Sequence, residues 1–253
     1  MSTRHTIIAY HAIGECPPDE DPHELFVSVD DFAAQMDFLA RRRNVVPLAR
    51  IVDGQIRGSG PAVAITFDDA YRSVLEVAAP ILARHGLPST VFVPTRWIGL
   101  QNGWIDPPSR PLDIMSSDEL IGAERSGIQV QSHGSEHVRY WEIDPSEIEA
   151  DVRSSVARLT EILGRAPRYL AYPFGPTSIQ ASRVVERCGL EAAFTLEQPP
   201  GGRFAMERVW IRPRHGLGVF ALKTSGRWSA SWRWSKAGRA GAAVLRPRVG
   251  RRR

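Results

Sequence analysis

The sequence predicts an α/β fold built on a largely parallel sheet or barrel, and three observations lead to that prediction. Short β-rich runs alternate with segments of helical periodicity, which is the pattern of strand–helix–strand units with right-handed crossovers. The length of 253 residues suits a single α/β barrel. The 43% hydrophobic and 24% charged residues are ordinary for a globular protein, and they exclude a disordered chain, collagen or a coiled coil.

Seven runs have the composition and length of strands. They cover residues 6–10, 62–67, 89–94, 128–132, 169–172, 192–195 and 208–211. The run at 62–67 is continuously apolar, as expected of a strand buried on both faces of a parallel sheet. The segment 97–115 has no periodicity and contains two tryptophans, so we expect a loop that lines a groove.

Helices are expected between these strands, and several of their ends carry recognisable signals. Ser28 followed by Asp31 resembles a capping box for a helix that ends near residue 43. Asp144 followed by Pro145 is a cap with proline at the first helical position, and that helix should end at Gly164. The other expected helices run to about residue 84, from 116 or 117 to about 126, and from 177 to 188.

Unusual polar residues follow four of the expected strands, and the carboxyl ends of parallel strands form one functional rim. These residues are His11, the pair Asp68-Asp69, His133 with His137 four residues later, and the Pro173-Phe174-Gly175 turn. Each has an ordinary explanation when taken alone, as a helix cap, a loop histidine or a turn. Their shared position on one rim favours a functional site instead.

One carboxylate and two imidazoles can hold a divalent metal and leave positions open, which is typical of catalytic zinc. The metal would polarise an acyl oxygen and activate water. A second, adjacent carboxylate could accept the proton of that water, and a histidine could protonate a leaving amine. A backbone N–H at the Pro-Phe-Gly turn could bind the oxyanion. The residues therefore predict metal-assisted hydrolysis of an amide or ester.

Three motifs in this order resemble the polysaccharide deacetylases with a NodB-homology domain, over about residues 5–212. They are Thr66-Phe67-Asp68-Asp69, Ser132-His133-Gly134-Ser135-Glu136-His137 and Ala171-Tyr172-Pro173-Phe174-Gly175. The opening Ala-Tyr-His-Ala-Ile at 9–13 resembles a subgroup that includes poly-N-acetylglucosamine deacetylases. The resemblance implies a distorted (β/α)7 barrel and removal of N-acetyl groups from N-acetylhexosamine units of a glycan.

The resemblance also implies a role for each site residue. Asp68 would be the general base, and Asp69, His133 and His137 would bind the metal. The backbone N–H of Phe174 would line the oxyanion site. The general acid would be His11, as in the subgroup with the opening Tyr-His; His215 is the alternative. Zinc is the expected metal, and cobalt, nickel or iron would also fit this ligand set.

Several residues depart from the family pattern. Gly134 stands where many relatives have Ser or Thr, and Val138 where Pro is common. Ala171 stands where many relatives have an arginine that pairs with the base. We expect Arg208, on a later strand, to replace that arginine.

The charge is divided unevenly along the chain. Residues 1–202 carry 18 Lys/Arg and 27 acids, whereas residues 203–253 carry 14 Lys/Arg and one acid. We therefore expect a deacetylase barrel at 1–218 and a basic, tryptophan-containing tail at 219–253. An anionic membrane surface is the expected partner of the tail, besides the alternative of a solvated segment; nucleic acid is not the expected partner.

The chain has two cysteines, no run of about 18 apolar residues and too short an apolar stretch at its start for a secretory signal. These features predict a cytoplasmic protein, peripheral to the inner membrane if the tail binds lipid. Three other functions stay open. The first is hydrolysis of another substrate on the same scaffold, such as a cyclic amide or acetylated xylan. The others are a non-haem iron oxygenase and a glycan-binding relative without turnover.

Overall fold

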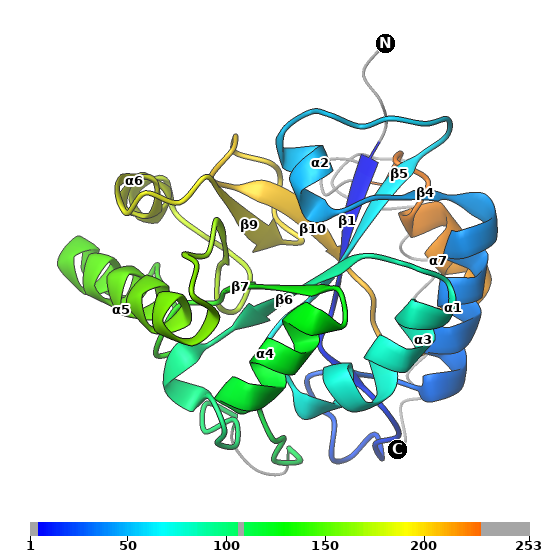
Figure 1. Ribbon diagram of the computed structural model, residues 1–253, viewed down its shortest axis with the longest axis horizontal. Coiled ribbons are helices and arrows are strands. Elements are labelled where there is room, and N and C mark those ends of the chain that lie inside the picture. The colour runs from blue at the N-terminus through cyan, green and yellow to red at the C-terminus, as the bar shows by residue number, and fades with distance from the viewer. Residues whose placement is uncertain (1–4, 106–108, 229–253) are drawn as a thin grey trace, which may run out of the picture.

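The computed structural model describes residues 5–105 and 109–228. Seven parallel strands close into a barrel in the order β1-β10-β9-β8-β7-β6-β5, and β5 returns to pair with β1 (Figure 1). These strands are β1 (His5–Tyr10), β5 (Ala62–Phe67), β6 (Ser89–Val93), β7 (Ile128–Ser132), β8 (Tyr169–Ala171), β9 (Ala192–Leu196) and β10 (Met206–Trp210). The predicted (β/α)7 barrel with parallel strands is confirmed.

The barrel is distorted because its strands do not pair along their full lengths. The first half of β5 pairs with the short strand β4 (Asn44–Val45), and only its second half pairs with β6. On the other side, β7 and β8 share a single pair of facing residues, Ser132 and Leu170. The strand β4 and a small sheet of β2 (Ala12–Ile13) and β3 (Phe26–Val27) were not expected, since two residues are too few for a sequence signal.

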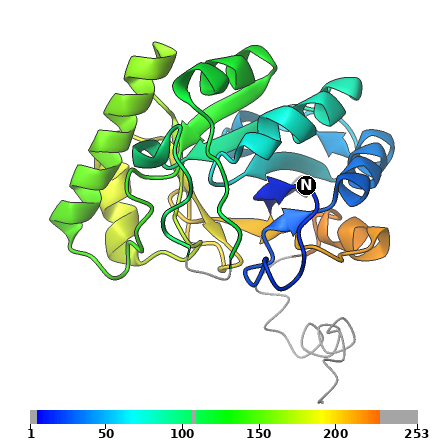
Figure 2. The ribbon, with the colours of Figure 1, turned by 90° about the horizontal axis from the view of Figure 1, so that it is seen from below.

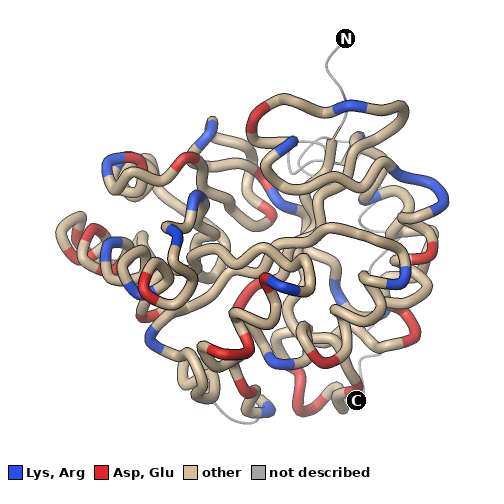
Figure 3. The backbone as a smooth tube through the Cα atoms, in the orientation of Figure 1, with Lys and Arg blue, Asp and Glu red and all other residues tan. Residues whose placement is uncertain are grey.

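Helices surround the barrel (Figures 1 and 2). They are α1 (Val29–Arg42), α2 (Leu48–Val52), α3 (Ala79–Arg84), α4 (Ser117–Arg125), α5 (Pro145–Leu163), α6 (Ile179–Arg187) and α7 (Leu217–Lys223), with the π-helix η1 (Val74–Ala78) and the 3₁₀ helix η2 (Thr95–Trp97). In Figure 1, α5 and α6 lie on one side of the barrel and α1, α3 and α7 on the other. Lys and Arg are interspersed with Asp and Glu over these helices, as expected of solvated faces (Figure 3).

The predicted end signals act as expected in three helices. The Ser28 hydroxyl accepts from the Asp31 N–H, and Ser116 with Glu119 forms a full capping box. Asp144 begins α5 with Pro145 at its first position, and the helix ends at Gly164 with a left-handed φ of 69°. Such signals fix helix ends because they satisfy backbone groups that the helix itself leaves without partners.

Alternation along the strands decides which side chains face the barrel interior. In β5, Ala62 and Ala64 pack in one cluster with inward residues of other strands, whereas Val63 and Ile65 pack outward with α1 and α3. The inward cluster also contains Ile7 of β1. The same alternation continues past the strand ends, so Asp68 and His11 emerge over the interior of the barrel.

The packed fold extends past residue 218, where the barrel was expected to end. That boundary falls inside helix α7, which packs on α1 through the ring of Phe220, 5.9 Å from that of Phe38. Arg43 also donates to the backbone carbonyls of Thr224 and Ala221. Residues 229–253 of the expected tail lie outside the described residues. In the part of the chain that is described, no helix is long and apolar enough to cross a membrane.

Candidate metal and hydrolytic centre

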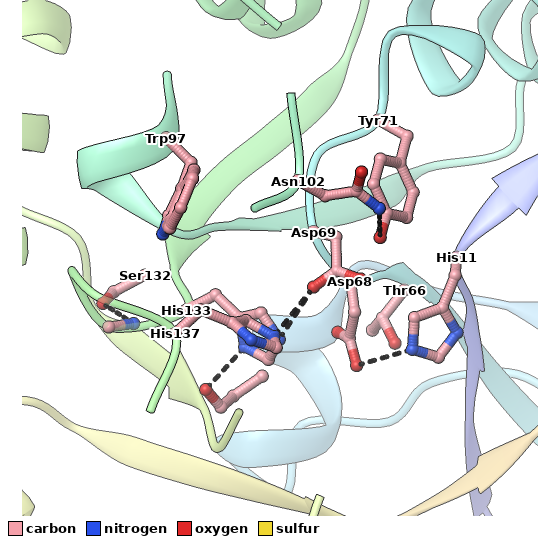
Figure 4. Close-up of polar contacts among 12 residues, drawn as sticks. His11, Thr66, Asp68, Asp69, Tyr71, Trp97, Asn102, Ser132, His133 and His137 are labelled. Atoms are coloured by element: carbon pink, nitrogen blue, oxygen red, sulfur yellow. Dashed lines mark hydrogen bonds and ion pairs between the residues drawn. The ribbon is translucent and has the colours of Figure 1, made fainter. Parts of the chain in front are cut away.

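The strand ends bring together the residues that the sequence singled out. His11 follows β1, Asp68 and Asp69 follow β5, and His133 follows β7. His137 comes from the loop after His133, and all five residues are at most 9% exposed. Figure 4 shows the two aspartates pointing in different directions, Asp69 toward the two histidines and Asp68 toward His11.

Asp69, His133 and His137 form a compact group that could hold a metal ion. The Asp69 Oδ1 atom lies 3.3 Å from His133 Nε2 and 3.1 Å from His137 Nε2. One ligand atom from each residue lies within 4.8 Å of the other two. Interactions with both histidines hold the pKa of Asp69 well below its ordinary value, although burial opposes ionisation.

The hydrogen bonding of His133 fixes which of its two ring nitrogens faces Asp69. Its Nδ1 atom lies 2.8 Å from the carbonyl oxygen of Ala171, which can only accept, so Nδ1 carries the proton. In its neutral form the ring presents a lone pair at Nε2 to a carboxylate oxygen of Asp69. Burial would lower the pKa of His133, but Asp68 and Asp69 outweigh burial and raise it. Two lone pairs repel unless a proton or a metal ion lies between them. One carboxylate and two imidazole nitrogens form a donor set that fits a divalent metal.

The backbone of the site is held in conformations that side chains seldom adopt. Asp69, Ala70, His137 and Phe174 all have a positive φ, between 53° and 67°. The left-handed region costs roughly 1–2 kcal/mol for a residue with a Cβ. Four such residues around one cavity therefore require contacts that fix the loops in place.

Asp151 of α5 makes such contacts with the loop between the two histidines. Its carboxylate accepts from the N–H of Ser135 at 2.9 Å, from the N–H of Glu136 at 2.8 Å and from the hydroxyl of Tyr140 at 2.6 Å. A Cβ at Gly134 would lie 2.6 Å from the same carboxylate. Glycine at 134, one of the departures from the family pattern, therefore leaves room for this brace.

Arg208 pairs with Asp68 inside the barrel, as expected. The Arg208 guanidinium, which is fully buried, donates to both carboxylate oxygens at 2.6 and 2.8 Å. It also contacts the hydroxyl of Thr66 and the carbonyl of Thr195. Burial alone would raise the pKa of Asp68, but Arg208 outweighs that effect and lowers it, so Asp68 is ionised at neutral pH.

The two candidate acids occupy different places. His11 Nε2 lies 4.0 Å from Asp68 Oδ2, and burial lowers the pKa of His11. His11 lines the cavity over the site, whereas His215 is not among the residues that line this cavity. The His215 ring instead accepts from the N–H of Arg212 at 3.1 Å. Geometry thus favours His11 over His215 as a group that meets a substrate.

A cavity of about 410 Å³ opens over these residues. Its walls include Trp104, Phe174 and Trp210, together with Arg139 from the loop before α5. The Trp104 ring stacks on the His137 ring, with 4.0 Å between their centroids. The Phe174 ring, from the turn after β8, lies 4.7 Å from the His137 ring. The expectation that segment 97–115 lines a groove is confirmed by Trp104.

Sequence reasoning did not find the roles of Trp104, Trp210 and Asp151. Trp210 follows Arg208 by two residues, so strand alternation could have placed it on the inner face. Asp151 lies within the apolar stripe of its helix, next to Val152. An acidic residue in such a stripe indicates a buried carboxylate with hydrogen-bond partners, so the sequence did carry a signal for Asp151. No local pattern indicates that Trp104 stacks on a histidine 33 positions later.

Comparisons with known proteins agree with this geometry. Residues 55–193 match the model of the polysaccharide deacetylase family, and the chain belongs to that family. The poly-beta-1,6-N-acetyl-D-glucosamine N-deacetylase of Staphylococcus aureus (strain MRSA252) is 25% identical over 201 residues, which are 73% of this chain and 67% of that protein.

Two solved structures share the fold. The Streptococcus pyogenes deacetylase PplD, in complex with acetate, superposes with a TM-score of 0.76 at 20% identity and covers 89% of this chain and 99% of its own. The structure of IcaB from Ammonifex degensii superposes with a TM-score of 0.73 at 23% identity and covers 88% of this chain and 97% of its own. At these identities the likeness establishes the barrel and its connections.

Proposed function

We propose that the protein is a metal-dependent deacetylase that removes N-acetyl groups from N-acetylhexosamine units of a glycan. The observation that carries the proposal is that the neighbouring aspartates Asp68 and Asp69 contact different groups. Asp69 faces two histidines with ligand geometry, while Asp68, held by Arg208, faces the cavity beside them. This arrangement suits hydrolysis, which needs a Lewis acid and a base side by side.

The chain's own residues would hold the metal and the reacting groups. Asp69, His133 and His137 are the proposed ligands, and zinc is the proposed metal, with cobalt, nickel or iron as alternatives. When bound, the metal would polarise the acetyl carbonyl and lower the pKa of a water molecule. Asp68, ionised because of Arg208, is the proposed base that accepts the proton of that water at a carboxylate oxygen.

The proton must then reach the leaving amine. Burial keeps His11 neutral at rest, so His11 has to gain a proton during the reaction before it can act as an acid. Asp68 Oδ2, at 4.0 Å from His11 Nε2, is the neighbouring group that could supply it. We therefore assign His11 the role of general acid, recharged from Asp68. The backbone N–H of Phe174 is proposed to stabilise the oxyanion, because Phe174 lies on the turn beside His137.

The cavity supports a carbohydrate as the substrate. Trp104 lies on the proposed ligand His137 and Trp210 lies beside His11, so both provide aromatic surface in the cavity. Such surface suits the apolar faces of sugars. The S. aureus relative acts, by its name, on poly-beta-1,6-N-acetyl-D-glucosamine. We propose a related glycan or glycan intermediate for this chain, met at the inner membrane surface if the basic tail binds anionic lipid.

Release of acetate tests the proposal directly. The purified, zinc-loaded protein is incubated with chitooligosaccharides, peptidoglycan fragments, lipid-linked N-acetylglucosamine and acetylated xylan, and acetate is measured. Metal-dependent release from an N-acetylated glycan supports the proposal. Release from acetylated xylan alone would reassign the protein as an esterase. Oxygen consumption with iron would favour an oxygenase, and glycan binding without any release would favour a binding protein.

A further inference from the structure

Arg139 stands in the cavity wall without a role in the chemistry described so far. It follows the proposed ligand His137 by two residues, in the loop between β7 and α5, and it lines the cavity. Its side chain is 47% exposed, whereas the other charged arginine of the centre, Arg208, is fully buried. Arg139 can therefore meet a ligand, and Arg208 cannot.

Contacts with aromatic rings place the Arg139 side chain next to the proposed centre. Its Cζ atom lies 4.3 Å from the centroid of the Phe174 ring, which is a cation–π contact. Phe174 in turn lies against His137, and Trp104 stacks on His137. The Phe174 ring thus lies between the Arg139 guanidinium and His137, a proposed metal ligand. The guanidinium is planar, and its N–H groups lie in that plane, where they can donate to a planar or tetrahedral anion.

Arg139 is the exposed cationic side chain in the wall of the cavity. Among the lining residues that the structure describes, Arg139 is the only Lys or Arg. The two lining carboxylates lie deep, Asp68 against Arg208 and Asp69 against the histidines. The partner of Arg139 is Glu142, and their ion pair is long, 3.7 Å from Nη1 to Oε2, with both side chains about half exposed.

Two acidic residues in the loop before β3 pair with other arginines and do not neutralise the positive charge of Arg139. Glu24 pairs with Arg212 at 2.7 Å, and Glu20 lies 3.8 Å from Arg110. These carboxylates do not line the cavity among the described residues. The cavity therefore combines a deep hydrolytic centre with one exposed, pre-oriented guanidinium.

We propose that Arg139 binds an acidic substituent, a carboxylate or a phosphoryl group, on the glycan close to the N-acetyl group that is removed. The inference rests on the proposed function and narrows its substrate class from glycans in general to anionic ones. A guanidinium fork matches both kinds of anion with two parallel hydrogen bonds. With a neutral glycan, the Arg139 guanidinium would contact only solvent and the carboxylate of Glu142, which lies 3.7 Å away.

Matched substrates test the inference. The substrates are chitotetraose, the same oligosaccharide phosphorylated at C6, and its C6-oxidised form, which carries carboxylates. We expect the wild-type protein to prefer one of the anionic forms by about tenfold in kcat/KM, and to lose most of that preference in high salt. The phosphorylated and oxidised forms distinguish the two sources of negative charge.

Variants assign the preference to Arg139. Arg139→Gln should lower kcat/KM for the anionic substrate about tenfold more than for chitotetraose, and Arg139→Lys should restore part of the difference because it keeps the charge and loses the fork. Arg96→Gln is the matched control, since Arg96 is a 63% exposed arginine that pairs with Glu136 and does not line the cavity. An equal loss for neutral and anionic substrates would assign Arg139 to holding Phe174 and overturn the proposal.

A binding measurement separates this inference from the proposed function. Metal-free protein is titrated calorimetrically with the phosphorylated and the oxidised tetrasaccharides. A Kd about tenfold weaker in Arg139→Gln than in wild type supports the subsite even if no acetate is ever released. The same Kd in both proteins, or no binding to wild type, contradicts it.

Discussion

Removing the carboxylate of Asp151 should loosen the proposed metal loop more than it weakens the fold elsewhere. In Asp151→Ala, the N–H groups of Ser135 and Glu136 and the hydroxyl of Tyr140 lose their acceptor. Ser135 and Tyr140 are almost fully buried, and each unpaired buried donor costs about 1–3 kcal/mol. The expected loss of unfolding free energy is therefore about 2–6 kcal/mol for these two donors, since Glu136 can turn to water.

The same loss should weaken metal binding. His137 keeps its left-handed φ of 57° only while the loop is held, and relaxation would move its ring away from Asp69. Loss of a residue that orients metal ligands typically weakens metal affinity 10- to 100-fold. The assay is competition for zinc with a chromophoric chelator, together with denaturant unfolding of the metal-free protein. Asp151→Asn keeps one acceptor oxygen and should fall between wild type and Asp151→Ala.

A control on the same helix separates the two effects. Val152 is fully buried in the cluster between α5 and the barrel, so Val152→Ala should destabilise the protein by about 2 kcal/mol and leave zinc affinity within twofold of wild type. If Asp151→Ala also binds zinc within twofold of wild type, the carboxylate stabilises the helix only and the reasoning about the loop is wrong.

Three further predictions concern the proposed base, a half-buried histidine and the basic tail. Asp68→Asn should keep zinc and lose about 10²–10⁴ in kcat, whereas His133→Ala should lose both zinc and activity; full activity of Asp68→Asn would exclude it as the base. Burial lowers the pKa of His215 to about 4, so between pH 6.5 and 4 the unfolded chain binds a proton that the folded protein does not. The unfolding free energy should fall by about 1–2 kcal/mol over that window after allowance for partial exposure, and His215→Asn should flatten the dependence in denaturant titrations. Full-length protein should sediment with vesicles that contain anionic lipid, and a form ending at residue 228 should not; equal sedimentation of both would remove the membrane hypothesis.

The sequence was sufficient to predict the barrel strands and the set of residues at their ends. Continuous apolar runs such as 62–67 have strong signals, and parallel pairing then places the residues after them on one rim. The shortest elements escaped prediction because two-residue strands such as β4 and a five-residue helix such as α2 carry no periodicity. Most of helix α7 was assigned to the tail because the sequence after residue 203 is rich in Lys and Arg. The burial of Phe220 depends on its contact with Phe38 of α1, which the local sequence does not indicate.

Contacts that depend on the closed barrel were harder to predict. The partnership of Arg208 with Asp68 joins residues 140 positions apart, and only the family pattern pointed to it. The brace from Asp151 and the stacking of Trp104 on His137 depend on how loops fold back over the rim. Positive φ values at Asp69 and His137 also had no signal, since neither residue is glycine.

The central claim is that one cation is shared by Asp69, His133 and His137. A crystal structure of the zinc-loaded protein, with anomalous diffraction collected on both sides of the zinc edge, tests it most directly. We expect one strong anomalous peak about 2.0–2.2 Å from an Asp69 oxygen and from the Nε2 atoms of both histidines. A peak elsewhere, or no peak at that place in protein that binds stoichiometric zinc, would contradict it.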